Sequence, residues 1–251
     1  MEKDLIETGI AAVEEPPANP AGDFASGTTA FDIAAEDIES AFHYMLTAKQ
    51  KRYLALRRGV ECFAACLLLL LLAIPFLFLA IIQKALAPKE PVFFRQERIG
   101  RNGKKITITK FRSMRSSAPH YCSTSELSDG GQYISGFGRF LRDYSVDELP
   151  QLLQVVSGRL SLVGPRPLIP QEAEVHRMRL RAGVYQLRPG ITGWAQINGR
   201  DLVTDRQKVE LDFEYLQTVS LKTDLKILKE TVKKVFRREG VREGGPEAKG
   251  K

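Results

Sequence analysis

An apolar run at residues 62–82 limits the fold of this chain more than any other feature. The run, CFAACLLLLLLAIPFLFLAII, has 21 residues and no charged or amide side chain. About 20 apolar residues are enough for a helix to cross the hydrocarbon core of a bilayer, whereas buried helices of soluble proteins have shorter apolar runs. We therefore predict that residues 49–90 form a membrane-anchoring helix.

Whether this helix crosses the membrane depends on Pro75 and on the charges at its ends. Pro75 lies near the middle, where it removes a backbone hydrogen bond and kinks or breaks a helix. A single crossing would place one of the two basic flanks outside, against the positive-inside tendency. A re-entrant hairpin with its helix break at Pro75 suits both flanks and is favoured, while a span stays open because proline is tolerated in spanning helices. The flanks contain Lys49, Lys51, Arg52, Arg57 and Arg58 before the run, and Lys84, Lys89, Arg95 and Arg98 after it.

Charge divides the rest of the chain into an acidic start and a basic body. Residues 1–48 carry a net charge of −9 and lack apolar periodicity, which predicts a largely disordered extension. The remainder carries +16, so we expect an anionic partner: membrane headgroups, phosphorylated substrates or nucleic acid. The polar, Gly-rich residues 237–251 predict a disordered tail.

Residues 91–236 have the pattern of a compact domain. Short strands at 92–94 and 106–109, separated by the turn residues 100–103, predict a β-hairpin. The predicted fold class is α+β: a membrane re-entrant helix hairpin, followed by a compact, mostly helical interfacial domain with a short β-hairpin.

Two helices are predicted within this domain. One should begin near Asp147, because apolar residues follow at helical spacing until Gly158. The other lies near the C-terminus and is amphipathic, with an apolar face and four lysines around it. It either lies on an anionic bilayer or closes the core. The apolar face of this second helix contains Leu225, Leu228, Val232 and Val235.

Two adjacent carboxylates, Asp147 and Glu148, precede Pro150. Proline suits the first turn of a helix, because its missing N–H costs nothing there. Both carboxylates would lie at the positive end of the helix dipole and point about 100° apart, so one could meet a substrate while the other holds a metal. On its own, the pair is explained as well by N-capping, which is the commoner role.

Basic side chains of the same domain could bind phosphate groups. Pro165 and Pro167 would hold Arg166 on a stiff backbone, and arginine forks bind phosphate oxygens bidentately. Arg142 lies five residues before Asp147 and could lean over the same site. The candidate phosphate-binding residues are Lys110, Arg112, Arg142 and Arg166.

Two other patterns indicate structure rather than chemistry. Arg188-Pro189-Gly190 has the pattern of a type II turn, with glycine at the position that needs a positive φ. The cysteines and histidines show neither disulfide nor zinc spacing, so any metal site would use carboxylates and suit a hard ion.

Five motifs occur in order: PVFFRQ (91–96), KFRSM (110–114), DELPQL (147–152), SLVGPRP (161–167) and RPGITGWAQ (188–196). Together they make residues 57–236 resemble the bacterial sugar transferases, also called monotopic phosphoglycosyl transferases. Arg57, Arg58 and Glu61 also match a basic pair and acid that precede the membrane helix in that family. The family's helix breaks at a Ser-Pro pair, and here Ile74 stands in place of the serine.

This resemblance implies a catalytic domain that works by a ping-pong mechanism. Asp147 would attack the β-phosphate of a UDP-sugar, releasing UMP and leaving a phosphosugar on its carboxylate. A polyprenyl (undecaprenyl) phosphate would then take the phosphosugar, giving a polyprenyl diphosphate-sugar. Glu148 would hold Mg²⁺, and Lys110, Arg142 and Arg166 would stabilise the developing charge.

The resemblance also implies a location and partners. We expect the bacterial inner (cytoplasmic) membrane, with the catalytic domain on the cytoplasmic face, and the first membrane step of surface polysaccharide or glycoconjugate synthesis. The expected partners are the UDP-sugar, polyprenyl phosphate, membrane lipids and downstream glycosyltransferases, and not nucleic acid.

Two alternative functions were weighed against the enzyme. A catalytically idle relative could act as a membrane scaffold or regulator, but it would have no need of the intact Asp147-Glu148 pair. A membrane-anchored nucleic-acid-binding protein would have aromatic or Arg-rich binding patches, and we find no such module.

Overall fold

A computed structural model describes residues 44–118, 133–199 and 203–237 of the chain. Residues 1–43 of the predicted acidic extension (1–48) lie outside the described residues. So do residues 238–251 of the predicted tail (237–251). Residues 44–47 already belong to the folded body, because Leu46 is buried and its N–H donates to Gln186 Oε1 at 3.1 Å.

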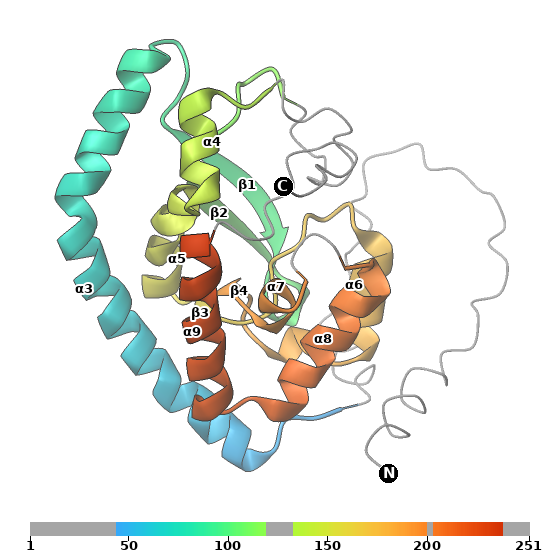
Figure 1. Ribbon diagram of the computed structural model, residues 1–251. Coiled ribbons are helices and arrows are strands. Elements are labelled where there is room, and N and C mark those ends of the chain that lie inside the picture. The colour runs from blue at the N-terminus through green and yellow to red at the C-terminus, as the bar shows by residue number, and fades with distance from the viewer. Residues whose placement is uncertain (1–43, 119–132, 200–202, 238–251) are drawn as a thin grey trace, which may run out of the picture.

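One long helix, α3 (Ala48–Leu86), runs along the whole domain (Figure 1). It has 39 residues and begins with a capping box in which Thr47 and Gln50 bind each other's backbone N–H groups. Only 6% of its most apolar 18-residue window is buried, so α3 is not the core helix of a soluble protein. Leu70 and Ile74, for example, are 75% and 69% exposed.

Pro75 lies inside this helix and does not end it. The predicted hairpin with two separate arms is therefore not what the structure shows: α3 stays helical on both sides of Pro75. Figure 1 shows it bowed, with the domain on the concave side. Proline removes one backbone hydrogen bond, which allows a helix to kink while the remaining bonds hold it together.

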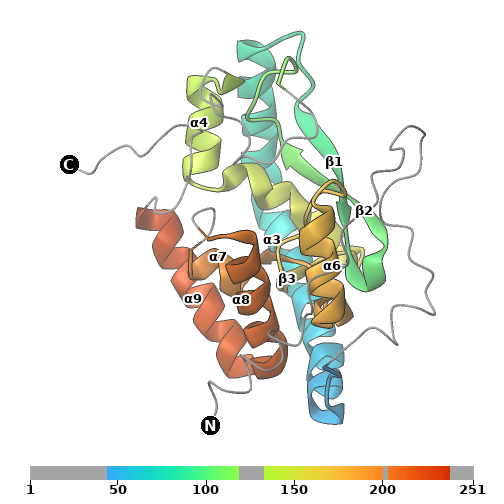
Figure 2. The same cartoon turned by 90° about the vertical axis from the view of Figure 1, so that its right-hand side faces the viewer.

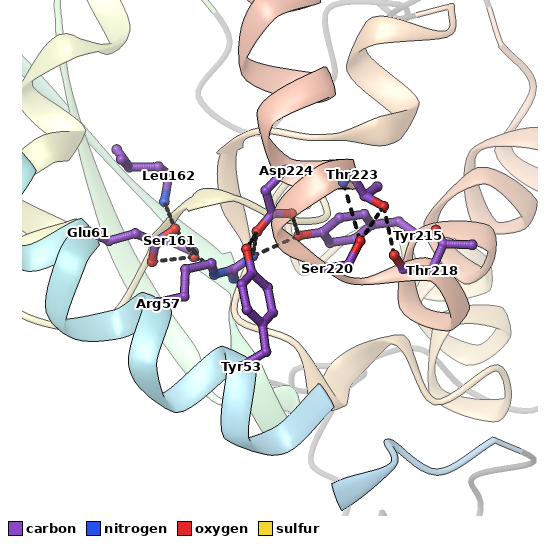
Figure 3. Close-up of polar contacts among 10 residues, drawn as sticks. All are labelled: Tyr53, Arg57, Glu61, Ser161, Leu162, Tyr215, Thr218, Ser220, Thr223 and Asp224. Carbon is purple, nitrogen blue, oxygen red and sulfur yellow. Dashed lines mark hydrogen bonds and ion pairs between the residues drawn. The ribbon is translucent and has the colours of Figure 1, made fainter. Parts of the chain in front are cut away.

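The N-terminal half of α3 is attached to the domain by a buried polar cluster around Arg57 (Figure 3). Arg57 donates to Asp224 Oδ2 at 2.7 Å, to Tyr215 Oη at 2.8 Å and to Ser161 Oγ at 2.8 Å. One turn further along, Glu61 accepts from the hydroxyl of Ser161 at 2.7 Å. These contacts join α3 to segments 100 to 167 residues away in the sequence.

The C-terminal half of α3 contacts the same domain. Gln83 Nε2 donates to the carbonyl of Arg112 at 2.6 Å. The Phe76 ring packs edge-on against Phe111, with ring centroids 5.3 Å apart. Both halves of the apolar helix therefore lie against one domain.

The domain contains two small sheets. The predicted hairpin is confirmed as the antiparallel pair β1 (Phe93–Ile99) and β2 (Lys105–Phe111), joined by the 3₁₀ turn η1 (Arg101–Gly103). In Figure 2 the hairpin and the α8–α9 pair lie on either side of α3. The second sheet pairs β3 and β4 in parallel. The remaining elements are α4 (Gly136–Asp143), η3 (Val146–Gln151), α5 (Leu152–Val156), β3 (Ser161–Val163), α6 (Ala173–Arg181), η4 (Val184–Gln186), β4 (Gly190–Thr192), α7 (Trp194–Ile197), α8 (Asp205–Thr218) and α9 (Leu221–Arg237).

The turn predicted at Arg188-Pro189-Gly190 is wrong. Gly190 has no positive φ and instead begins β4. A Cβ atom at Gly190 would lie 2.1 Å from the backbone nitrogen of Gly164, so glycine is needed here for close backbone packing. Gly158 does end α5 as predicted, with a φ of +79°.

The C-terminal helix α9 closes the core with one face, which confirms one of its two predicted roles; the bilayer contact stays a prediction. Asp224 and Ile227 are buried, so one face closes the core. Another face leaves an apolar stripe in solvent, at positions that share one side of a helix. The exposed stripe contains Leu221, Leu225, Val232 and Phe236.

Loss of the Asp224 carboxylate should weaken the fold more than loss of a surface carboxylate. Asp224→Ala removes the closer of the two carboxylates paired with the buried Arg57 guanidinium, Glu61 being 3.5 Å away, and breaking such a buried pair typically costs about 3–5 kcal/mol. In the control Asp205→Ala, which removes a partly exposed pair with Lys208, the loss should stay below about 1 kcal/mol. Denaturant unfolding in detergent would measure both, and equal losses would contradict the proposed importance of the cluster.

Candidate active site

The Asp147-Glu148 pair lies in the first turn of the 3₁₀ helix η3, directly before α5. The helix predicted to begin near Asp147 does begin there, but with 3₁₀ geometry, since Pro150 lacks the N–H that would close an α-helical turn. The preceding residue, Ser145, has a left-handed φ of 54°, which is strained for a residue with a side chain. The N-cap residue of this helix is Ser145, so neither carboxylate occupies the N-cap position.

Two predicted cations meet at Glu148. Lys110 Nζ donates to Glu148 Oε1 at 2.6 Å, and Arg166 Nη2 lies 3.3 Å from the same oxygen. The Lys110 and Glu148 side chains are 16% and 14% exposed, so this pair is largely shielded from solvent. Burial lowers the pKa of Lys110, and the Glu148 carboxylate opposes that change.

Asp147 is the more deeply buried carboxylate of the pair, with 8% of its surface exposed. Burial, opposed chiefly by the charge of Lys110, raises the pKa of Asp147 to about 6. The neighbouring Glu148 carboxylate adds to the increase, whereas Arg142 and Arg166 counteract it. At neutral pH the Asp147 carboxylate is therefore mostly ionised but poorly hydrated, which suits a nucleophile.

Of the four predicted phosphate-binding residues, three act on the carboxylate pair and one lies elsewhere. Arg142, at the end of α4, lowers the pKa of Asp147 from nearby. Arg112 contacts the Phe94 ring and donates to the carbonyl of Pro91 at 3.0 Å. The structure therefore does not bring Arg112 to the carboxylates, because its side chain is turned along the base of the hairpin.

Arg166 is held from behind by a buried ion pair. Arg179 Nη1 donates to the carbonyl of Arg166 at 2.8 Å, and Arg179 Nη2 lies 2.5 Å from Asp212 Oδ2. Arg179 and Asp212 are 2% and 1% exposed, so this support is fixed within the core. Together with Pro165 and Pro167, it restrains the backbone that presents the Arg166 guanidinium.

A small pocket lies beside this group, and Lys110, Glu148 and Arg166 line it. Two further polar residues of its wall, Arg98 and Gln151, were not predicted. Arg98 was counted among the basic flanks of the membrane helix. The alternation of the predicted hairpin could have found it, because Arg98 and Lys110 lie on the same face of the paired strands. The rest of the wall is formed by Ile108, Pro167, Gly190 and Ile191.

The carboxylates fit the predicted Mg²⁺ in donor chemistry. Within the described ranges, no three His, Cys, Asp or Glu side chains are grouped to hold a metal ion. Mg²⁺ does not need such a cage, because it is usually held by one or two carboxylates together with substrate phosphates and water. Glu148 in the cavity wall, with Asp147 beside it, supplies hard oxygen donors of that kind.

Comparison with known proteins gives a consistent result. A profile of the family described as bacterial sugar transferase matches residues 52–238. The chain is 41% identical over 189 residues to the uncharacterized sugar transferase EpsL of Bacillus subtilis (strain 168), covering 75% of this chain and 91% of that protein.

Two further relatives have names that state an activity. The chain is 38% identical over 188 residues to the UDP-glucose:undecaprenyl-phosphate glucose-1-phosphate transferase of Escherichia coli (strain K12), covering 72% of this chain but only 40% of that protein. It is 40% identical over 185 residues to a protein of the same name from Caulobacter vibrioides (strain ATCC 19089 / CIP 103742 / CB 15), covering 70% of this chain and 68% of that protein. The fold, the carboxylate pair in its cationic surroundings and these matches agree: the chain belongs to the bacterial sugar transferase family.

Proposed function

We propose that the protein transfers a phosphosugar from a UDP-sugar to polyprenyl (undecaprenyl) phosphate, through a covalent intermediate on Asp147. The observation that carries the proposal is the buried Asp147 carboxylate beside a cavity lined by Lys110, Glu148 and Arg166. The relatives named for transfer of glucose 1-phosphate from UDP-glucose to undecaprenyl phosphate support the substrate class.

The reaction has two displacements at one phosphorus. In the first, an Asp147 oxygen bonds to the β-phosphorus, the bond to the bridging oxygen breaks, and UMP leaves with that oxygen. In the second, a phosphate oxygen of the lipid bonds to the same phosphorus, and the bond to Asp147 breaks. A carboxylate nucleophile thereby divides one difficult transfer into two easier steps.

The cations position and neutralise the phosphate groups. Phosphoryl transfer is catalysed chiefly by placement and charge stabilisation. Arg166 offers a rigid fork, Lys110 a buried point charge and Arg142 a charge close to Asp147. Mg²⁺, held by Glu148, would neutralise the charge that develops on the diphosphate as it is cleaved.

We also propose that the enzyme is monotopic, with α3 entering and leaving the cytoplasmic face of the inner membrane. Arg57 and Gln83, near the two ends of the apolar run, both contact the same domain. A helix that crossed the bilayer would place these two contacts on opposite sides. The exposed apolar stripe of α9, flanked by lysines, offers a second contact with an anionic membrane surface. Enzymes that extend the lipid-linked sugar are the partners expected next in the pathway.

Asp147→Asn should remove the nucleophile and lower UMP release from accepted UDP-sugars by about a thousandfold or more. Wild-type enzyme given a UDP-sugar without acceptor should release one equivalent of UMP and gain the mass of one phosphosugar. The exposed Asp205→Asn is the control and should behave as wild type. UMP release that strictly requires the lipid acceptor would argue against the covalent intermediate.

Glu148→Gln should lower turnover by about a hundredfold or more and raise the Mg²⁺ concentration needed for half-maximal activity, since an amide is a weaker metal donor. A titration of UMP release against Mg²⁺ measures both effects. The matched control is Glu97→Gln, an exposed carboxylate on β1. An unchanged Mg²⁺ requirement in Glu148→Gln would remove Glu148 from the metal site.

The monotopic arrangement predicts equal labelling from one side. Lys51→Cys and Lys89→Cys place single exposed thiols near the two ends of α3, in a background without the native cysteines. Both should react with an impermeant maleimide in inside-out vesicles and neither in intact spheroplasts. Opposite accessibility of the two positions would show that α3 spans the membrane.

A further inference from the structure

Arg98 and Lys110 line the same cavity from different positions along the hairpin. Arg98 pairs with Ile106 across the hairpin, and Lys110 lies four residues further along β2, about 13 Å at the usual strand rise. Ile108 lies between them and lines the same cavity. The two cations therefore share one face of the hairpin and line the cavity on either side of Ile108 along the strands.

The Arg98 guanidinium is partly buried, and the attractive charges of Glu172 and Glu148 act on it from beyond ion-pair distance. Its Nη2 donates to Gln96 Oε1 at 2.6 Å, and its Nη1 makes a long contact of 3.3 Å with the carbonyl of Pro167. Its Nε is buried and has no hydrogen-bond partner. No carboxylate forms an ion pair with Arg98 in the part of the chain that the structure describes. Burying a cation in this position costs free energy unless a bound anion pairs with it.

Arg98 also lies close enough to Arg166 for the two charges to repel each other. Burial, together with the charge of Arg166, lowers the pKa of Arg98 to about 10, so it remains a cation at neutral pH. The cavity wall contains three cations and the carboxylate of Glu148. Because Lys110 and Arg166 already share that carboxylate, an anion near Arg98 would satisfy the charge that is left.

We propose that Arg98 binds a phosphate monoester: the phosphate of UMP as it leaves, and the phosphate of the lipid acceptor that replaces it. The proposal rests on the phosphosugar transfer proposed above. Arg98 would thereby contact both substrates, and would be the residue that distinguishes a nucleotide from a nucleoside.

The direction of the two displacements explains why one site would serve both phosphates. Asp147 must lie against the phosphorus that it attacks, and Lys110 binds the residue next to it, so the transferred group occupies the Lys110 end of the cavity. In an in-line displacement the leaving oxygen departs on the side opposite to the attacking one. The acceptor must approach the phosphorus from the side that UMP has vacated, because the Asp147 carboxylate occupies the opposite side of that phosphorus.

Equilibrium binding of UMP and of uridine to the full-length protein in detergent, with Mg²⁺ present, tests the first part of the proposal. Arg98→Gln should weaken UMP binding by about 10- to 100-fold, as expected for loss of a charged hydrogen-bond donor, and leave uridine binding unchanged. Arg98→Lys keeps the charge but loses the guanidinium fork, so its affinity for UMP should lie between those of the wild type and Arg98→Gln. The control is Arg95→Gln on the other face of β1, which should bind both ligands as wild type does.

Two results would overturn this part. One is an Arg98→Gln protein that still prefers UMP over uridine as strongly as wild type does. The other is an equal loss of affinity for both ligands, which would indicate a purely structural role. If thermal unfolding shows that Arg98→Gln is not folded, Arg98→Lys decides the question by the same comparison.

A second measurement tests whether the acceptor phosphate uses the same site. Enzyme loaded with phosphosugar is mixed with a short-chain polyprenyl phosphate, and the acceptor concentration for half-maximal rate is determined. Arg98→Gln should raise that concentration about 10-fold or more; an unchanged value would overturn the shared site. Because UMP binding needs no turnover, failure of the proposed reaction, seen as no UMP release from any UDP-sugar, remains distinguishable from failure of this proposal.

Discussion

The buried contacts of Arg57 hold the apolar helix and the polar domain in one arrangement. The apolar outer face of α3 makes no contacts that would attach the helix to the part of the polar domain that the structure describes. Arg57 makes that attachment by binding Asp224, Tyr215 and Ser161, which come from three different elements. Because a buried guanidinium needs both paired carboxylates and hydrogen-bond acceptors, these contacts act together with the ion pair to Glu61. The position of α3 relative to the candidate active site follows from them.

The sequence predicted those parts of the molecule whose signals are local. The apolar run of α3 is recognised by its length and lack of charge, and the β1–β2 hairpin by its short strands and the turn residues between them. Both are present in the structure. The grouping of Lys110, Glu148 and Arg166 did not follow from periodicity, because the three residues lie on separate elements. The resemblance to a known family pointed to them, and the structure brings them together.

The predictions that the structure does not bear out depend on tertiary contacts, which the pattern of a single sequence does not show. Arg112 belongs to the same motif as Lys110, but its side chain is held by Phe94 and Pro91 at the base of the hairpin. Gly190 was assigned to a turn because Pro-Gly favours one, whereas close contact with the Gly164 backbone requires it. Both depend on tertiary contacts with residues distant in sequence. The continuity of α3 through Pro75 is similar, since the domain packs against both halves of the helix.

The proposed reaction requires both the burial of Asp147 and the cations around it. A covalent phosphosugar intermediate would be lost by hydrolysis if water reached it freely, and a carboxylate that is 8% exposed limits that access. The same burial raises the pKa of Asp147, and nearby cations are needed to keep it ionised. Glu148 neutralises two of those cations, Lys110 and Arg166. Substrate phosphates would take over that role and release Glu148 for the metal, so that the metal site would be completed only when there is a diphosphate to cleave.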